Sequence, residues 1–540
     1  MIRGSESFEA TRGLWQVPIA PTLEAQTISL CGRMRDEAID LGRSARRRRL
    51  AALPRTLAAL AVLAAMLAGC AAGPHFVRPA APAVTAYTTA AAAPNLSAGA
   101  GERSQRLAIG QGIPAAWWRR FRSHALDAMV DEALANNPTL DAAKATLAQA
   151  QQAVLEARGG YYPQIDLGAS AERQKGPAFA LGLVPPGQSL PQFNLYSVGP
   201  TVSFSPDVFG LAKRRVEERQ ALADAQAYQL AAATLTIAGN TVTEALTLAS
   251  LRAQIDAATR IIAEDEKDLA LVRRKFAAGR VARGDVLAAE AELANDRTLL
   301  PELGRQRAEV EDALAVLLGK SPAESTPPGF DLTDFELPAE LPLSLPSALA
   351  RRRPDILAAE SLVHARSAEV GIATGRMYPN ITLSGSVATA ALEPGSLFGS
   401  SSGVWALAGG LTAPIFHGGA LRAQKRQAVE GFRASLAIYR QTVLAAFGQV
   451  ADTLRELGHD AELVDAERRA LDTADAALTL QSASYAAGRS DLLRLLDAKR
   501  GVERARLGYA RATAQRYVDS ARLFVALGGG SWDGGEEEKR

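Results

Sequence analysis

The sequence is poor in the side chains that most often carry chemistry, since its 540 residues include only two cysteines and five histidines. Cys31 lies in a leader that we expect to be removed. The one remaining cysteine can form neither an internal disulfide nor a thiolate metal cluster. The histidines are scattered, and none forms a ligand pair at helical spacing. We therefore expect no metal, no cofactor and no catalytic site.

Long apolar runs and a large net charge are also missing. No stretch of 18 apolar residues occurs beyond the N-terminal region, so no internal membrane-spanning helix is expected. Residues 1–69 hold ten arginines and six acidic residues, which leaves 50 basic and 52 acidic side chains and a net charge near −2 in the rest of the chain. A chain without a basic excess is not expected to bind nucleic acid.

The N-terminal region contains a secretion signal. The basic cluster Arg46–Arg49 precedes an apolar run over residues 57–67, and small residues follow. The run ends in Leu-Ala-Gly-Cys, which resembles a bacterial lipobox, where the cysteine is lipidated and begins the mature protein. We predict that residues 1–69 are an N-terminal extension and lipoprotein signal peptide and that Cys70 carries a covalent lipid. An ordinary signal peptide with an incidental cysteine is the alternative.

An internal duplication organises the rest of the chain. Four sequence blocks recur in the same order; Pro138 is echoed by Pro354, and the Ala-Ala-Gly-Arg at 277–280 is echoed at 486–489. These two short motifs are typical of plain helix C-caps, where glycine is expected. The predicted organisation is a lipidated extended tether at 70–121, a first repeat at 122–320, a Pro-rich linker at 321–346 and a second repeat at 347–530.

Helix-forming residues dominate both repeats. Each repeat is predicted to contain an opening helix, two strands and then a very long helix, which starts near Phe209 in the first repeat and near Gly419 in the second. We expect the long helices to break near Ser250 and Gly458, to return, and to be followed by a last helix.

Four strands are predicted at about 162–173, 195–206, 378–390 and 403–414. Apolar residues alternate with small or polar ones, and the strand lengths match tilted transmembrane strands. A half-buried soluble sheet that caps a helical bundle would show the same alternation. In the membrane interpretation, the predicted lipid-facing residues are Ile165, Leu167, Val198, Val202, Phe204, Ile381, Leu383, Trp405 and Leu407.

Four strands cannot close a barrel, and an open sheet edge in lipid leaves backbone groups without hydrogen-bond partners. Three chains would supply twelve strands. The predicted fold class is therefore mainly α with a transmembrane β part, namely a trimeric 12-stranded β-barrel continued by a long α-helical periplasmic tunnel. In a trimer, each charged residue near the expected helix turn would be repeated three times and form a ring. The alternative is that these residues lie at a solvated helix end and have no such role. This predicted periplasmic gate consists of Asp452, Arg455, Glu456 and Asp460.

Several motifs resemble the outer-membrane efflux protein family, the TolC-type factors, and within it the lipoprotein branch that serves resistance-nodulation-division pumps. They are LAGCAAGPHFVRPA at 67–80, the paired Tyr-Pro strand starts, PDVFG, PIFHGG, both Ala-Ala-Gly-Arg motifs and FVALGGGSW at 524–532. The resemblance implies a homotrimer in outer-membrane lipid that extends into the periplasm and docks on a periplasmic adaptor protein and an inner-membrane pump. Asp452 best matches the acidic ring of the family, whereas His417 departs from its pattern. The two Ala-Ala-Gly-Arg motifs resemble the equatorial or adaptor-contacting region of the family, which is the alternative to plain helix C-caps.

The function implied is that of a passive exit duct for drugs or other small molecules, opened at its periplasmic tip by the adaptor and the pump. Two alternatives stay open. The same fold serves as the exit duct of type I protein secretion systems. A structural periplasmic lipoprotein of coiled helices, without a pore, is the other.

Overall fold

The computed structural model describes residues 72–80, 82–88, 95–96, 104–175, 192–325 and 327–530, so that Cys70 lies outside the described residues. The chain divides into two compact units. The first unit comprises residues 1–80, 149–223 and 361–436, and the second comprises residues 81–148, 224–360 and 437–540. Each unit takes residues from both halves of the sequence, so the compact units cut across the sequence repeats.

The two sequence repeats fold into corresponding elements. Helices α4 (Pro138–Gly159) and α9 (Pro354–Gly375) have 22 residues each, and both begin with proline, whose missing N–H is tolerated at the first helical position. Helices α5 (Leu211–Ala277) and α10 (Ala420–Ala486) have 67 residues each. The duplication seen in the sequence is therefore also a duplication of structure.

The predicted breaks in the long helices are wrong, because α5 and α10 continue through Ser250 and Gly458. A single glycine costs a helix only about 1 kcal/mol relative to alanine, and serine costs less. Buried apolar side chains continue on both sides of each position, and they include Leu246, Leu251, Leu454 and Leu457. The chain reverses later, at residues 278–282 and 487–491.

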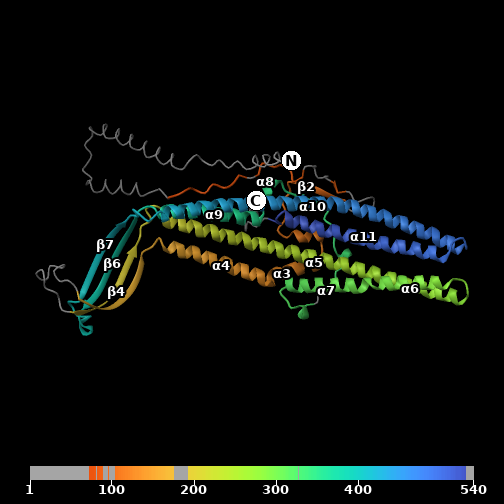
Figure 1. The fold of residues 1–540 in the computed structure, drawn as a ribbon, viewed down its shortest axis with the longest axis horizontal. Coiled ribbons are helices and arrows are strands. Elements are labelled where there is room, and N and C mark those ends of the chain that lie inside the picture. The colour runs from red at the N-terminus through yellow and green to blue at the C-terminus, as the bar shows by residue number, and fades with distance from the viewer. Residues whose placement is uncertain are drawn as a thin grey trace, which may run out of the picture. The chain divides into compact units, whose positions relative to one another are not determined.

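The four predicted strands are present and form one antiparallel sheet in the order β3-β4-β6-β7 (Figure 1). Their ends lie within two residues of the predicted positions. Within the described part of the chain, no further strand pairs with the outer edges of β3 and β7. The strands are β3 (Gln164–Gln174), β4 (Phe193–Phe204), β6 (Asn380–Ala391) and β7 (Gly403–Thr412).

The strand register gathers the predicted lipid-facing residues on a single face. Ile165 pairs with Val202, Val202 with Gly385, and Gly385 with Leu407, which makes one row across all four strands. Because side chains alternate between faces, Ser203 belongs to the opposite face. By the same register the apolar face contains Ile165, Leu167, Val198, Val202, Phe204, Ile381, Leu383, Trp405 and Leu407.

In the second unit, the predicted tether and linker contain regular structure. Strand β2 (Gln105–Ile109) lies between β1 (Asn95–Leu96) and β5 (Glu340–Leu343), and it is parallel to β5. In the 3-10 helix η2 (Trp117–Phe121), the ring of Trp117 stacks on Phe524 at 5.2 Å. The tether prediction is therefore wrong for residues 105–109, which pair with β5, and for residues 117–121, whose aromatic side chains Trp117 and Phe121 are buried beside the C-terminal helix α11 (Leu492–Ala526).

The last helix of the first repeat is divided, whereas α11 is continuous. Pro301 has no N–H to donate to the preceding turn, and the chain is interrupted at Thr298, between α6 and α7. The remaining elements are α3 (His124–Asn136), α6 (Arg283–Arg297), α7 (Leu299–Leu317), α8 (Pro346–Leu349), η4 (Pro322–Glu324), η5 (Leu332–Asp334) and η6 (Pro394–Ser396).

The sheet register yields a paired prediction. Val202→Arg, on the apolar face, should destabilise the assembled protein by about 2–4 kcal/mol, because it puts a charge against hydrocarbon. Ser203→Arg, one residue further on the opposite face, should leave stability nearly unchanged. Thermal dissociation of the detergent-solubilised oligomer measures both variants, and equal losses would mean that the faces are wrongly assigned.

Candidate functional site

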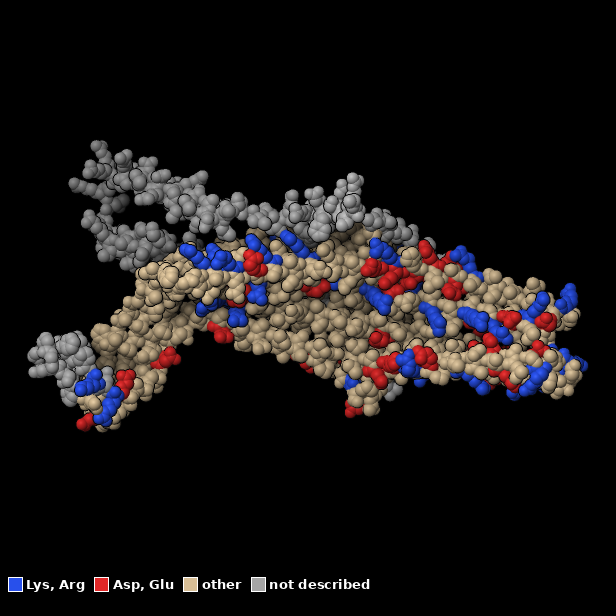
Figure 2. Space-filling model, viewed as in Figure 1, with Lys and Arg blue, Asp and Glu red and all other residues tan. Residues whose placement is uncertain are grey.

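The first candidate feature is the exposed sheet of the first unit. Leu167, Trp405 and Leu407 on its apolar face are 78–81% exposed within the single chain. A contiguous apolar surface of this kind marks a membrane or protein contact. In Figure 2, the strand region carries few charged side chains, and most of these lie toward the end of the sheet away from the helices. The opposite face contains small or polar residues, among them Ser197, Thr201, Ser203, Thr382 and Ser384.

The junction between β4 and α5 is held by local contacts. The Asp207 carboxylate accepts the backbone N–H groups of Ala212 at 2.9 Å and Lys213 at 2.8 Å, which satisfies free donors at the start of α5. Gly210 has φ +74°, a conformation that glycine adopts without strain. Phe209 stacks on Tyr378 at 5.1 Å, next to the start of β6. The sheet therefore passes into the helices through an ordered junction.

A cleft of about 990 Å³ lies below this junction, within the first unit. Its lining combines charges of both signs with apolar side chains, among them Phe209 and Ile372. Burial, together with the nearby Glu369, raises the pKa of the Glu218 carboxyl above its usual range. The charged residues of the lining are Glu156, Asp207, Arg215, Glu218, Arg219, Glu369 and Arg376.

The second candidate feature is the pair of helical hairpin ends in the second unit. Gly279 and Gly488 follow α5 and α10 with φ +66° and +70°. The N–H groups of Arg280 and Arg489 each donate to a carbonyl five residues earlier at 2.9 Å, as in a Schellman motif. The helix C-cap interpretation of the two Ala-Ala-Gly-Arg motifs is thereby confirmed, and both motifs are turns at hairpin ends.

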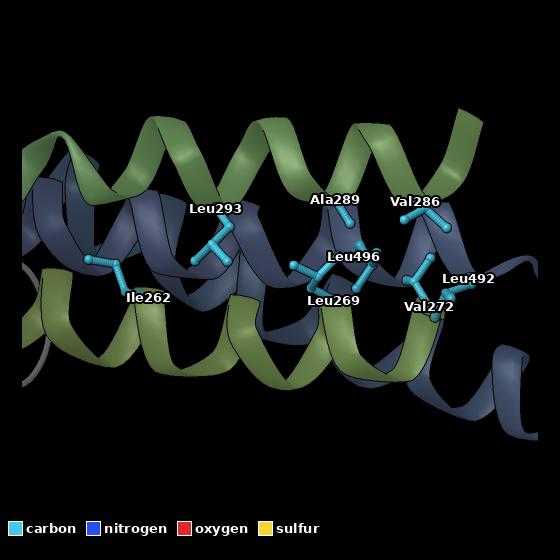
Figure 3. Packing of buried hydrophobic residues seen from close by; sticks show 8 residues of the cluster. All are labelled: Ile262, Leu269, Val272, Val286, Ala289, Leu293, Leu492 and Leu496. Atoms are coloured by element: carbon cyan, nitrogen blue, oxygen red, sulfur yellow. The ribbon is translucent and has the colours of Figure 1, made fainter. Parts of the chain in front are cut away.

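An apolar cluster joins the two hairpins (Figure 3). Beside it, Lys499 Nζ on α11 donates to Asp268 on α5 at 2.8 Å, and Arg500 Nε on α11 lies 3.4 Å from Glu292 on α6. Apolar packing and ion pairs together tie α11 to both other helices. The cluster consists of Ile262, Leu269, Val272, Val286, Ala289, Leu293, Leu492 and Leu496.

The predicted gate residues do not lie at a turn, because α10 continues through them. Arg455 donates to Asp452 at 3.1 Å, and the two side chains are exposed on α10. Glu456 is exposed as well, whereas Asp460 is buried. The geometric basis for placing a gate at these four residues is therefore lost, since the hairpin ends lie elsewhere in the sequence.

Asp460 lies beside the buried Asp519 of α11. Burial, the neighbouring Asp519 carboxyl and Glu456 raise the pKa of Asp460 to about 7, and the positive charge of Arg516 only partly opposes them. Arg522 Nη1 and Gln515 Nε2 donate to the Asp519 carboxylate at 2.9 and 2.8 Å. Burial and the two neighbouring carboxyl groups therefore favour the protonated form of Asp460.

Sequence reasoning missed the ion pairs that join α11 to α5 and α6. Asp268 and Lys499 are 231 positions apart, and no local pattern links them. The hairpin ends had a usable signal, because each Ala-Ala-Gly-Arg is a helix-ending motif followed within a few residues by an aspartate, Asp285 or Asp491.

Comparison with known proteins identifies the family. The profile described as "Outer membrane efflux protein" matches residues 129–320 and 345–529. The chain belongs to the outer membrane efflux protein family. This efflux protein is 30% identical to outer membrane protein OprJ of Pseudomonas aeruginosa over 88% of its own length and 95% of OprJ. It is 31% identical to the toluene efflux pump outer membrane protein TtgF of Pseudomonas putida over 87% of its length and 96% of TtgF.

Solved structures agree with this assignment. The outer-membrane channel OprN has a TM-score of 0.75 and 27% identity, with 85% of this chain and 99% of OprN covered. The open-state MtrE channel of Neisseria gonorrhoeae has a TM-score of 0.69 and 26% identity, with 85% and 98% covered. The predicted fold class, a TolC-type trimeric channel with long helices and four strands from each chain, is confirmed.

The efflux protein is thus an outer-membrane channel of an efflux system, and its family is one of ducts and not of enzymes. Among the described residues, no group of histidine, cysteine, aspartate and glutamate side chains is arranged to hold a metal ion. In the same part of the chain, no helix is both long and apolar enough to cross a membrane.

The Asp460 environment predicts how stability depends on pH. A carboxyl whose pKa rises from 3.8 to about 7 on folding binds its proton more tightly in the folded state, so its contribution to stability is lost as pH rises from about 4 to 7. Asp460→Asn should remove this pH-dependent contribution to the free energy of unfolding and should flatten the pH profile of the unfolding temperature. The exposed Asp452→Asn is the control, and an equally steep profile in Asp460→Asn would contradict the assignment.

Proposed function

We propose that three copies of this chain form the outer-membrane exit duct of a tripartite efflux pump, anchored by a lipid on Cys70. The observation that carries the proposal is the sheet, which has one apolar face, one polar face and two outer edges that pair with no other strand of the described residues. A sheet of this kind is stable in lipid only when its edges are paired. Pooling the strands of three copies pairs every edge and encloses the polar faces around water.

The internal repeat supports a definite pairing between copies. By position, β6 corresponds to β3 with an offset of 216, and β7 corresponds to β4 with an offset of 209. Within one chain, β4 pairs with β6 so that Val202 lies opposite Gly385. By these offsets, Leu411 of β7 corresponds to Val202, and Ala169 of β3 corresponds to Gly385. If the contact between copies repeats this pairing, Leu411 lies opposite Ala169 of the next copy, and both residues belong to the apolar face.

The hairpin ends are the proposed docking and closing region. They carry exposed apolar side chains beside the turns, and Phe276 and Leu493 are 40% and 41% exposed. Such residues suit contact with the helices of a periplasmic adaptor or with one another in a closed duct. The ion pairs of Lys499 and Arg500 hold α11 against its neighbours, so the closed arrangement is supported by polar links as well as by packing.

Small organic molecules are the proposed cargo. Relatives are described as outer-membrane proteins of toluene efflux and of pyoverdine export. The mixed charges of the cleft below the sheet and the small polar side chains of the sheet support a hydrated path and not a tight binding site.

Planar-bilayer recording of the purified trimer tests the proposal. We expect a small resting conductance, which should rise in the double variant Asp268→Ala with Lys499→Ala, because the link between α5 and α11 is lost. The matched control is Asp452→Ala with Arg455→Ala, which also removes one acid and one base, but from an exposed pair that contributes only about 0–1 kcal/mol. A folded trimer that never conducts would exclude a duct, and a rise only in the control would return the gate to Asp452.

A further inference from the structure

A buried arginine near the start of α5 binds the first described residues of the chain. Arg214 is 2% exposed, and its Nε and Nη2 atoms donate to the carbonyl oxygens of Ala72 at 3.1 Å and Gly73 at 3.3 Å. The N–H of Ala72 donates in turn to the carbonyl of Phe209 at 2.9 Å. A buried guanidinium is costly unless its donors are satisfied, so this arginine requires residues 72 and 73 in place.

Two further side chains complete the contact. Arg214 Nη1 pairs with the Glu217 carboxylate at 2.7 Å, and the other oxygen of Glu217 lies 3.0 Å from His364 Nε2 on α9. The ring of Phe76 stacks on the His364 imidazole with centroids 4.3 Å apart. We call Arg214, Glu217 and His364 the N-terminal clasp.

Glycines allow the segment to lie directly on α9. A Cβ atom on Gly73 would come within 2.4 Å of the Gly371 Cα, and Gly73 has φ +91°. His364 and Gly371 lie two turns apart on one face of α9, roughly 10 Å along its axis. Three residues of extended chain from Gly73 to Phe76 cover about the same distance. The segment is therefore extended and antiparallel to α9.

This direction bears on the predicted lipid anchor. Followed back from Phe76 to Gly73, the chain runs toward the C-terminal end of α9, beyond which β6 begins at Asn380. Cys70 is only two residues upstream of Ala72, and two residues reach at most roughly 7 Å. The same edge of the sheet contains Phe204, the last residue of β4, and Thr412, the last residue of β7.

We propose that the N-terminal clasp sets the height of the membrane anchor, so that acyl chains on Cys70 enter the bilayer level with the periplasmic edge of the apolar sheet face. The partner of this device is a lipid surface. The inference rests on the proposed function, in which the sheet spans the outer membrane and Cys70 is lipidated. Without the clasp, the acylated N-terminus could enter the bilayer away from the edge of the sheet.

The mobility of residue 77 tests the clasp itself. Val77 is 82% exposed, so Val77→Cys accepts a nitroxide label without disturbing the contacts, and lipidation blocks the thiol of Cys70. In full-length trimers in phosphatidylethanolamine–phosphatidylglycerol vesicles, we expect a restricted spectrum that becomes mobile in Arg214→Gln. Phe76→Ala, which leaves every helix intact, should have the same effect if Arg214→Gln fails to fold. Arg215→Gln, at the exposed neighbouring position, is the control. Unchanged spectra in both Arg214→Gln and Phe76→Ala would overturn the proposal.

The rate of trimer insertion into vesicles tests the link to the lipid. If clasp and lipid act as one device, Arg214→Gln and Cys70→Ser each slow insertion, and the double variant is no slower than the slower single variant. The proposal is overturned if the fold-decrease in insertion rate of the double variant equals the product of the two single fold-decreases. It is also overturned if neither single variant slows insertion. Intact mass of the parent protein should show an acylated chain that begins at residue 70. A free Cys70 would also overturn the proposal, whereas a failed channel is revealed separately by the absence of conductance.

Discussion

The unpaired edges of a sheet with one apolar face constrain the rest of this molecule. Among the described residues of the single chain, the outer edges of β3 and β7 pair with no further strand, and exposed apolar side chains lie on the same sheet. Hydrocarbon offers no hydrogen-bond partner for the backbone groups of such edges, and each unsatisfied group costs several kcal/mol there. Association of copies satisfies both requirements at once, because it pairs the edges and turns the apolar faces outward. The internal repeat would make this association regular, since in the proposed trimer the contact between copies repeats the contact within each chain.

The helices follow from the same arrangement. Each strand pair leads into a 67-residue helix, the first of them through a junction capped by Asp207, and the hairpin turns come only after residues 277 and 486. These helices stay unbroken because buried apolar side chains continue along them, even where a residue such as Gly458 has low helix propensity. At the hairpin ends, ion pairs with partly exposed partners hold α11 to α5 and α6. Contacts of that kind are modest in energy, which suits the proposed opening of this region when a partner binds.

The sequence was sufficient to predict the duplication, the four strands and the two faces of the sheet. Period-two alternation fixes which residues share a face, so Ile165, Val202 and Leu407 could be grouped before their pairing was known. The helix breaks could not be located from composition, because Gly458 is tolerated where packing continues on both sides. The charge cluster around Asp452 was therefore misplaced at a turn. The N-terminal clasp could not be predicted from the sequence either, because Arg214 binds backbone carbonyl groups 141 and 142 positions away.

Cysteine cross-linking between copies tests the central claim most directly. In one chain, Ala169 and Leu411 lie on opposite edge strands. The row of Ala169 reaches β7 at Gly403, eight residues from Leu411, so a disulfide between the Ala169 and Leu411 positions must join two copies. The account predicts that Ala169→Cys with Leu411→Cys, or the adjacent pair Ser170→Cys with Gly410→Cys, gives covalent trimers under mild oxidation. A pair displaced by two residues, Leu167→Cys with Leu411→Cys, should not. Efficient cross-linking of the displaced pair alone, or an intact trimer that no pair cross-links, would contradict the proposed closure of the sheet.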